Sequence, residues 1–179
     1  MSSVRQRSAP KSPSEVLKVR SPLTRRAVPS IFGQADFGGA VVVDIGAGYG
    51  AKGMYAAKRG ARHVVLLDVD EEALREPDDT VDKVVGDAHF LPFKDGAADV
   101  AIFWNVLQFL HDEERALGEV ARVARRYVVF SVYNAASGRR YTWEEFLERA
   151  RGLGSLVRWR RLGNVQFQAV VRREDRRTS

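Results

Sequence analysis

The chain of 179 residues contains no cysteine, and it has only two methionines. Disulfides, zinc–thiolate sites and cysteine nucleophiles are therefore excluded. No uninterrupted apolar run reaches the roughly 18 residues that a membrane-spanning helix needs, and the N-terminus has no apolar signal-peptide core. Hydrophobic residues make up 45% of the chain, as in globular proteins. We therefore expect a globular cytoplasmic protein that holds no metal and does not enter a membrane.

Charge is unevenly placed along the chain. Residues 1–26 carry a net charge of +6 and residues 151–179 another +6, whereas residues 27–150 carry −6. Basic segments can neutralise phosphates, so one interpretation is that the basic termini contact RNA. The other is that they are solvated tails that keep the protein soluble.

Short apolar runs alternate with helix signals through the middle of the chain. Helix starts are predicted at Ser12-Pro13 and Ser21-Pro22, at Asp112, and at Thr142, where Glu145 completes a capping box. Alternation of this kind favours a parallel sheet with helices on both faces. The predicted strands are residues 41–45, 63–67, 81–85, 99–104 and 127–132.

The C-terminal part follows a different pattern. Residues 156–162 and 165–171 are predicted strands joined by Gly163-Asn164, which indicates a tight antiparallel hairpin. We expect an α/β fold: a three-layer, doubly wound, mostly parallel sheet of seven strands that closes with this hairpin. The domain should cover residues 36–179, after a basic tail and short helices in residues 1–35.

A glycine-rich turn, Asp44-Ile45-Gly46-Ala47-Gly48-Tyr49-Gly50, joins the first predicted strand to the first predicted helix. Ligands of open parallel sheets bind beyond the carboxyl ends of the strands, and glycine lets the backbone come close to a ligand. Asp68 ends the second strand, 24 residues after Asp44, and Asp87 ends the third. A carboxylate at Asp68 can accept both hydrogen bonds of a ribose diol.

The glycine spacing alone leaves two cofactor classes open. Gly46, Gly48 and Ala51 also satisfy the pattern of a dinucleotide-binding turn, so a nicotinamide-dependent oxidoreductase is an alternative. Asp44 favours the other class, because a carboxylate suits a cationic amino-acid ligand and does not suit a pyrophosphate.

These motifs resemble those of class I S-adenosylmethionine-dependent methyltransferases, nearest the type 11 group. The resemblance covers about residues 36–171, and its motifs occur in the family's order. They are the glycine turn, residues 67–74, Gly86-Asp87-Ala88, Leu91-Pro92-Phe93, Asp95-Gly96, Asp99-Val100 and Asn105-Val106-Leu107. The final antiparallel hairpin also suits methyltransferases better than dehydrogenases.

The resemblance implies a role for each matching residue toward S-adenosylmethionine. Asp44 and the turn with Gly46, Ala47, Gly48 and Gly50 would line the methionine part. Asp68 would hold the ribose hydroxyls, and Val69 would lie against the adenine. Asp87 would accept from the adenine amino group, Ala88 would offer its backbone N–H, and Asn105 would face the methionine part and the reacting methyl.

Two features depart from the family. Only 19 residues separate Asp68 from Asp87, so the helix before the third strand should be truncated. No insertion after the fourth or fifth strand is long enough to cap a substrate pocket, which must be covered by the N-terminal helices or be open.

The acceptor and the catalytic residue stay open at this stage. Methyl transfer can be driven largely by positioning, and a base is needed only if the acceptor must lose a proton. Candidates near the strand ends are His89, His111, Tyr49 and Tyr133, and none is singled out. The acceptor would be a small molecule or RNA. The alternative is a non-enzymatic module that binds S-adenosylmethionine or RNA.

Overall fold

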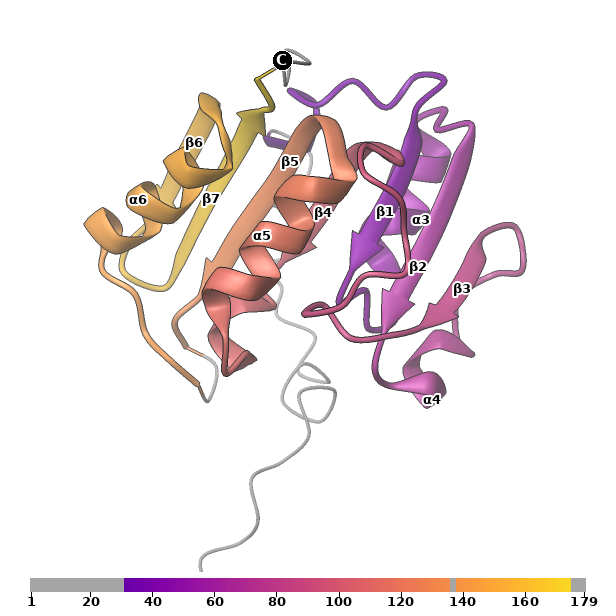
Figure 1. Cartoon of the computed structure of the whole chain (residues 1–179), viewed down its shortest axis with the longest axis horizontal. Helices are drawn as coiled ribbons and strands as arrows, with labels where there is room; N and C mark the ends of the chain where they lie inside the picture. The colour runs from indigo at the N-terminus through magenta and orange to yellow at the C-terminus, as the bar shows by residue number, and fades with distance from the viewer. Residues whose placement is uncertain (1–30, 136–137, 175–179) are drawn as a thin grey trace, which may run out of the picture.

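The structure, a computed structural model, describes residues 31–135 and 138–174, and its seven strands form one sheet (Figure 1). The strand order is β3-β2-β1-β4-β5-β7-β6. The strands are β1 Val41–Ile45, β2 His63–Asp68, β3 Asp82–Val85, β4 Ala98–Trp104, β5 Ala124–Tyr133, β6 Ser155–Leu162 and β7 Gln166–Arg172. The helices are α3 Ala51–Lys58, α4 Glu71–Leu74, α5 Glu113–Val123 and α6 Trp143–Leu153, with a 3₁₀ turn at Leu107–Phe109.

The predicted topology is confirmed. The first five strands pair in parallel, and β7 is antiparallel to both of its neighbours. Asp112 caps α5, and Thr142 with Glu145 forms the capping box of α6. The helix starts expected at Ser12-Pro13 and Ser21-Pro22 lie outside the described residues. So does most of the expected N-terminal segment, and the division at residue 35 stays a prediction.

One strand begins well before its expected start. β5 begins at Ala124, immediately after α5 and three residues before the predicted start. The apolar run begins only at residue 127, because Arg125 and Arg126 are exposed at the start of the strand. The short helix before β3 is truncated as predicted: α4 has four residues, and Pro77 follows within one turn.

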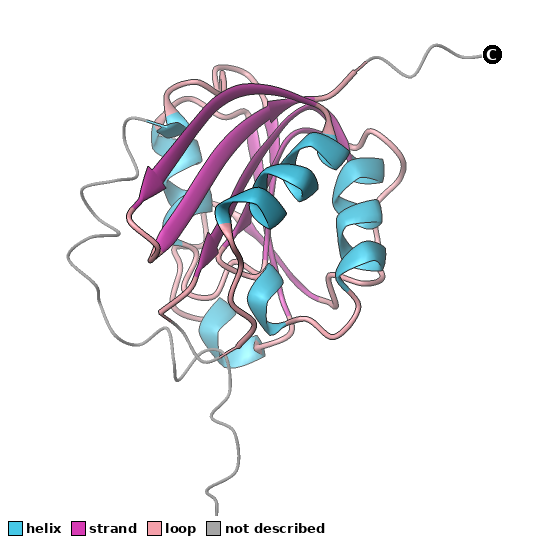
Figure 2. Cartoon of the chain, turned by 90° about the vertical axis from the view of Figure 1, so that its left-hand side faces the viewer, coloured by secondary structure: helices cyan, strands magenta, loops and turns pink. Residues whose placement is uncertain are grey.

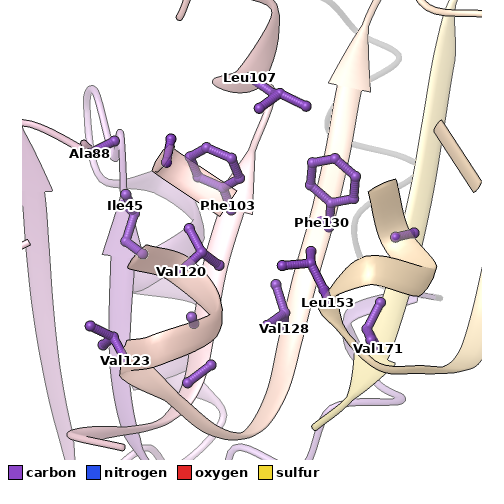
Figure 3. Close-up of a cluster of buried hydrophobic side chains, with 14 of the residues drawn as sticks. Ile45, Ala88, Phe103, Leu107, Val120, Val123, Val128, Phe130, Leu153 and Val171 are labelled. Carbon is purple, nitrogen blue, oxygen red and sulfur yellow. The ribbon is translucent and has the colours of Figure 1, made fainter. Parts of the chain in front are cut away.

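Helices cover both faces of the sheet (Figure 2). On one face, residues 31–37, α3 and α4 bury apolar side chains against β1, β2 and β4. On the other, α5 and α6 pack on β4, β5 and β7, and Phe103 and Phe130 lie in the core of this face (Figure 3). The Phe130 ring stacks on that of Phe103 and also on that of Phe146 from α6. Removing such side chains from water supplies the main favourable free energy of folding.

The loop between β3 and β4 covers the rest of the α5 face without a helix. It buries Ala88 and Leu91 in the core of that face. The Arg122 guanidinium of α5 holds the loop by donating to the carbonyl oxygens of Leu91 and Phe93 and to the carboxylate of Glu119. The loop has no helix in which its backbone carbonyls could be hydrogen-bonded, and Arg122 supplies donors for two of them instead.

Replacing Arg122 tests this anchoring. We expect Arg122→Ala to lower the free energy of unfolding by about 2 kcal/mol, because it removes the donors of two partly buried carbonyls and leaves the Glu119 carboxylate with only the Leu91 N–H. Urea denaturation of the variant measures the change. Arg126→Ala is the matched control, since its ion pair with Asp36 spans 3.8 Å near the surface, and it should change stability by less than about 0.5 kcal/mol. Equal losses in both variants would contradict the assignment.

Candidate functional site

The glycine turn lies at the carboxyl ends of β1, β2 and β4, where the sequence placed it. Gly46, Gly48 and Gly50 have φ angles of 69°, 51° and 70°, in the left-handed region that favours glycine. At Gly46 a side chain is also excluded by space, because a Cβ would lie 2.4 Å from a methyl carbon of Val106. At Gly48 a Cβ would meet nothing within 4 Å. The turn thus packs against Val106 at Gly46, whereas at Gly48 it leaves space that a ligand can fill.

Asp44 is the buried acid of the site, with 1% of its surface exposed. Its Oδ2 accepts a 2.7 Å hydrogen bond from the Gly53 N–H in the first turn of α3. Burial raises the pKa of the Asp44 carboxyl to about 7, although the Gly53 N–H and the charge of Lys52 act to lower it. The site therefore contains a carboxyl group that titrates near neutral pH.

Lys52 brings a cation to the same place. Its ammonium lies 5.7 Å from the centre of the Trp104 ring, within the range of a cation–π contact. Burial lowers the pKa of Lys52, and the negative charge of Asp44 opposes that shift. Trp104 is itself buried against Phe32, with ring centres 4.9 Å apart. Trp104 thus belongs to the wall between α3 and residues 31–37.

Asp68 connects the end of β2 to the glycine turn. Its Oδ2 accepts from the Gly48 N–H at 2.6 Å, and its Oδ1 accepts from the Asp70 N–H at 2.9 Å. A carboxylate oxygen has two lone pairs, so each oxygen can accept one further hydrogen bond. Val69, the next residue, is 63% exposed. The two carboxylate oxygens of Asp68 therefore lie next to the exposed apolar side chain of Val69. The first could accept hydrogen bonds from a ribose, and the second could pack on a flat base.

Asp87 lies at the end of β3 and contacts His89. Its Oδ1 accepts from the His89 N–H at 2.9 Å and lies 2.6 Å from Nδ1 of the same residue. The backbone N–H of His89 is the largest cause of the lowered pKa of the Asp87 carboxyl. Ala88 between them is buried in the core. The His89 ring is 3% exposed and lies 4.3 Å from that of His111.

Asn105 follows β4 in a left-handed conformation, with φ 60°. The Ser131 hydroxyl donates to its Oδ1 at 2.6 Å, and the Asn105 N–H donates to the backbone carbonyl of Ser131 at 3.0 Å. The side-chain amides of Gln166 and Gln108 donate to its Oδ1 and to its carbonyl oxygen, at 3.2 and 2.8 Å. Four bonds therefore hold Asn105 in a backbone conformation that is uncommon for a residue other than glycine.

The structure thus brings Asp44, Asp68, Asn105 and the glycine turn to one edge of the sheet. Asp87 and Ala88 lie at the neighbouring end of β3, parallel to β2. Of the candidate bases, His89 is buried beside Asp87, His111 and Tyr49 are exposed, and Tyr133 is half-buried at the end of β5. Within residues 31–135 and 138–174 no group of three potential metal ligands is found, and no helix there is long and apolar enough to cross a membrane.

Sequence reasoning missed several residues that build the site. Gly53 is one, because a Cβ there would lie 2.2 Å from a methyl carbon of Leu66; a glycine inside a predicted helix is its signal. Lys52 gave no signal, since a lysine in a helix is ordinary. The sequence predicts only that Gln166 lies in a strand. Its contact with Asn105 gives no local signal, because the two residues are 61 positions apart.

Comparison with known proteins finds similarity to methyltransferases. A family model described as "Methyltransferase domain", of the type 11 group, matches residues 43–131. A glycine/sarcosine/dimethylglycine N-methyltransferase of Actinopolyspora halophila is 32% identical over 114 residues, which cover 57% of this chain and 20% of the relative. A sarcosine/dimethylglycine N-methyltransferase of Halorhodospira halochloris is 34% identical over 96 residues, or 47% and 33%. The chain thus spans a third or less of the length of these relatives.

Solved structures share the fold. A methyltransferase from Aquifex aeolicus described as SAM-dependent superposes with a TM-score of 0.70 at 18% identity, covering 92% of this chain and all of that one. The sequence match supports the resemblance to methyltransferases of the type 11 group, and the solved structure shares the class I fold.

The raised pKa of Asp44 predicts a specific pH dependence of stability. Because the folded-state pKa of about 7 lies above the ordinary aspartic acid value of 3.8, folded protein binds more protons than unfolded protein between these pH values. Stability from Asp44 is therefore lost as pH rises through this window, by at most about 1.4 kcal/mol per pH unit. Asp44→Asn removes this dependence.

Urea denaturation of both proteins from pH 4 to 8 checks the prediction. The difference in unfolding free energy between the original protein and Asp44→Asn should fall with rising pH and level off above about 7. Titrations elsewhere in the chain cancel in this difference. A difference that is constant or rises with pH would show that Asp44 is ionised throughout.

Proposed function

We propose that this chain, whose fold and sequence resemble those of class I S-adenosylmethionine-dependent methyltransferases, binds that cofactor at the glycine turn and transfers its methyl group to an acceptor. The observation that carries the proposal is the connection of Gly48 to Asp68. One hydrogen bond of 2.6 Å places an open backbone turn beside a carboxylate with free lone pairs. The turn would take the methionine part and the carboxylate the ribose.

The residues present suit the parts of this cofactor. Asp44 lies beneath the turn and would offset the positive charge of the methionine part. Asp68 would accept from the ribose hydroxyls, and exposed Val69 would lie against the adenine. Asp87 and Ala88 would complete the adenine contacts from β3, although Asp87 already accepts two contacts from His89.

The chain's own part in transfer is positioning. The sulfonium of the bound cofactor would supply an electrophilic methyl group to an acceptor atom, and a neutral thioether would be the leaving group. Asn105 is held by Ser131 and Gln166 at the end of β4, so a group facing the reacting methyl would be fixed before the acceptor arrives. Fixing the reactants in this way can supply much of the rate. A deprotonated or neutral amine acceptor would need no residue as base.

The acceptor we propose is a small molecule, with RNA as the alternative. The relatives named for glycine and sarcosine methylation favour a small amine. The basic termini, outside residues 31–174 for the most part, are the observation that favours RNA.

Asp68→Asn tests the cofactor site. We expect it to weaken S-adenosylmethionine binding by ten- to a hundredfold, because it removes the charge from two hydrogen bonds that the ribose would donate, each worth roughly 1.5 kcal/mol or more. Isothermal titration calorimetry measures the change. Asp82→Asn is the matched control, because Asp82 is an exposed carboxylate at the amino end of β3, level with Val65 and three residues along the strand from Asp68. Binding that is equal in the original protein and Asp68→Asn would refute the site.

Transfer itself is tested with a radiolabelled methyl donor and a cell extract. Label should enter an acceptor with the original protein and fail to enter with Asp44→Ala. If the label enters small metabolites, the proposed acceptor class is supported; if nuclease releases it from macromolecules, RNA is the acceptor. Cofactor binding without any labelled acceptor across extracts would point to a binding module that performs no transfer.

A further inference from the structure

The outer edge of β6 carries the most basic surface of the hairpin. β6 is the last strand of the sheet order, and among the described residues no strand pairs with its outer side. It stands at one end of the sheet, and Figure 2 looks onto that side. Residues 155–173 contain five arginines and neither aspartate nor glutamate. The outer side of this eight-residue strand is therefore open, and the charged residues within the strand are all arginines.

Four consecutive side chains in this strand are three guanidinium groups and one indole. Arg158, Trp159, Arg160 and Arg161 are all exposed, and Trp159 keeps 54% of its surface in solvent. By register, Trp159 and Arg161 stand on the α6 face, opposite Ala169 and Phe167, whereas Arg158 and Arg160 stand on the other face. Arginine thus flanks both sides of the edge. We name these four residues the β6 edge.

The charge of the β6 edge excludes one obvious occupant. A second copy pairing with this edge would bring two rows of arginine together, and like charges opposed across strands are destabilising. The hydrogen bonds of Arg161 go to neutral oxygens, the carbonyl of Gly163 and the side chain of Asn164, which leave its charge uncompensated. The edge calls for a partner that is negatively charged.

We propose that the β6 edge binds single-stranded RNA, with phosphates on the arginines and a base stacked on Trp159. Single strands offer both partners in each nucleotide, an anionic phosphate and a base whose flat face is uncovered. A duplex covers its base faces, and an acidic protein surface presents carboxylates without regularly spaced aromatic rings. This surface goes beyond methyl transfer and does not depend on it.

The test is fluorescence anisotropy of a labelled oligouridine of about 12 nucleotides titrated with the full chain. Trp159→Ala should weaken binding about tenfold, as expected for the loss of one stacked base, and Trp159→Phe should restore most of it. Arg158→Gln/Arg160→Gln should weaken binding and reduce the slope of log affinity against log salt by about 1.4, at about 0.7 per lost phosphate contact. A duplex of the same length should bind more weakly.

The matched control is Arg59→Gln/Arg62→Gln, which removes two exposed arginines near α3 and β2. It should leave the affinity unchanged. The proposal is overturned if oligouridine does not bind, if the control weakens binding as much as Arg158→Gln/Arg160→Gln, or if Trp159→Ala has no effect. Sedimentation velocity showing a dimer that Trp159→Ala dissociates would assign the edge to a second copy instead.

S-adenosylmethionine binding is measured on the same Trp159→Ala protein. It should equal that of the original protein, because three strands separate the β6 edge from β1 in the sheet order. Normal cofactor binding with lost RNA affinity supports the surface. Asp68→Asn should in turn lose cofactor affinity and keep normal RNA binding. The two variants together therefore distinguish a failure at the cofactor site from a failure at the β6 edge.

Discussion

The hydrogen bond from the Gly53 N–H to Asp44 is the constraint on which the rest of the site depends. It joins the end of β1 to the first turn of α3 inside the protein, where Asp44 is almost fully buried. Burying a carboxylate is costly unless it is hydrogen-bonded and near opposite charge. Here one N–H and the nearby Lys52 compensate the charge only in part, which is why the pKa rises. The protein thus retains a destabilising charge beneath its glycine turn.

This cost is understandable if a cation completes the site. The turn above Asp44 is open at Gly48, tied to β2 through Asp68, and bounded by Asn105 at the end of β4. Each of these elements is held by contacts within the folded chain. The positioning is therefore prepared in advance, which is how binding energy is kept for the reacting groups. The acidic site and the arginine-rich β6 edge lie in different parts of one sheet, so a cationic cofactor and an anionic partner need not compete.

Much of the site could be predicted because its signals are local. The glycines of the turn lie within a few consecutive residues, and each acid directly follows an apolar run. Parallel strands then bring their carboxyl ends to one edge of the sheet. The rest depends on contacts between residues far apart in sequence. Asn105 is held by Ser131 and Gln166, and the β3–β4 loop by Arg122, and no local pattern announces such partners. The early start of β5 also escaped prediction, because its first residues are exposed arginines.

Proton release on cofactor binding tests the central claim most directly. If Asp44 is largely protonated at pH 6 and ionises to meet a cationic methionine part, binding must expel a proton from the protein. Calorimetric titration with S-adenosylmethionine at pH 6, in buffers of different ionisation enthalpy, measures that number. We predict a release approaching one proton in the original protein and close to none in Asp44→Asn. The same proton count in both proteins would contradict the role given to Asp44.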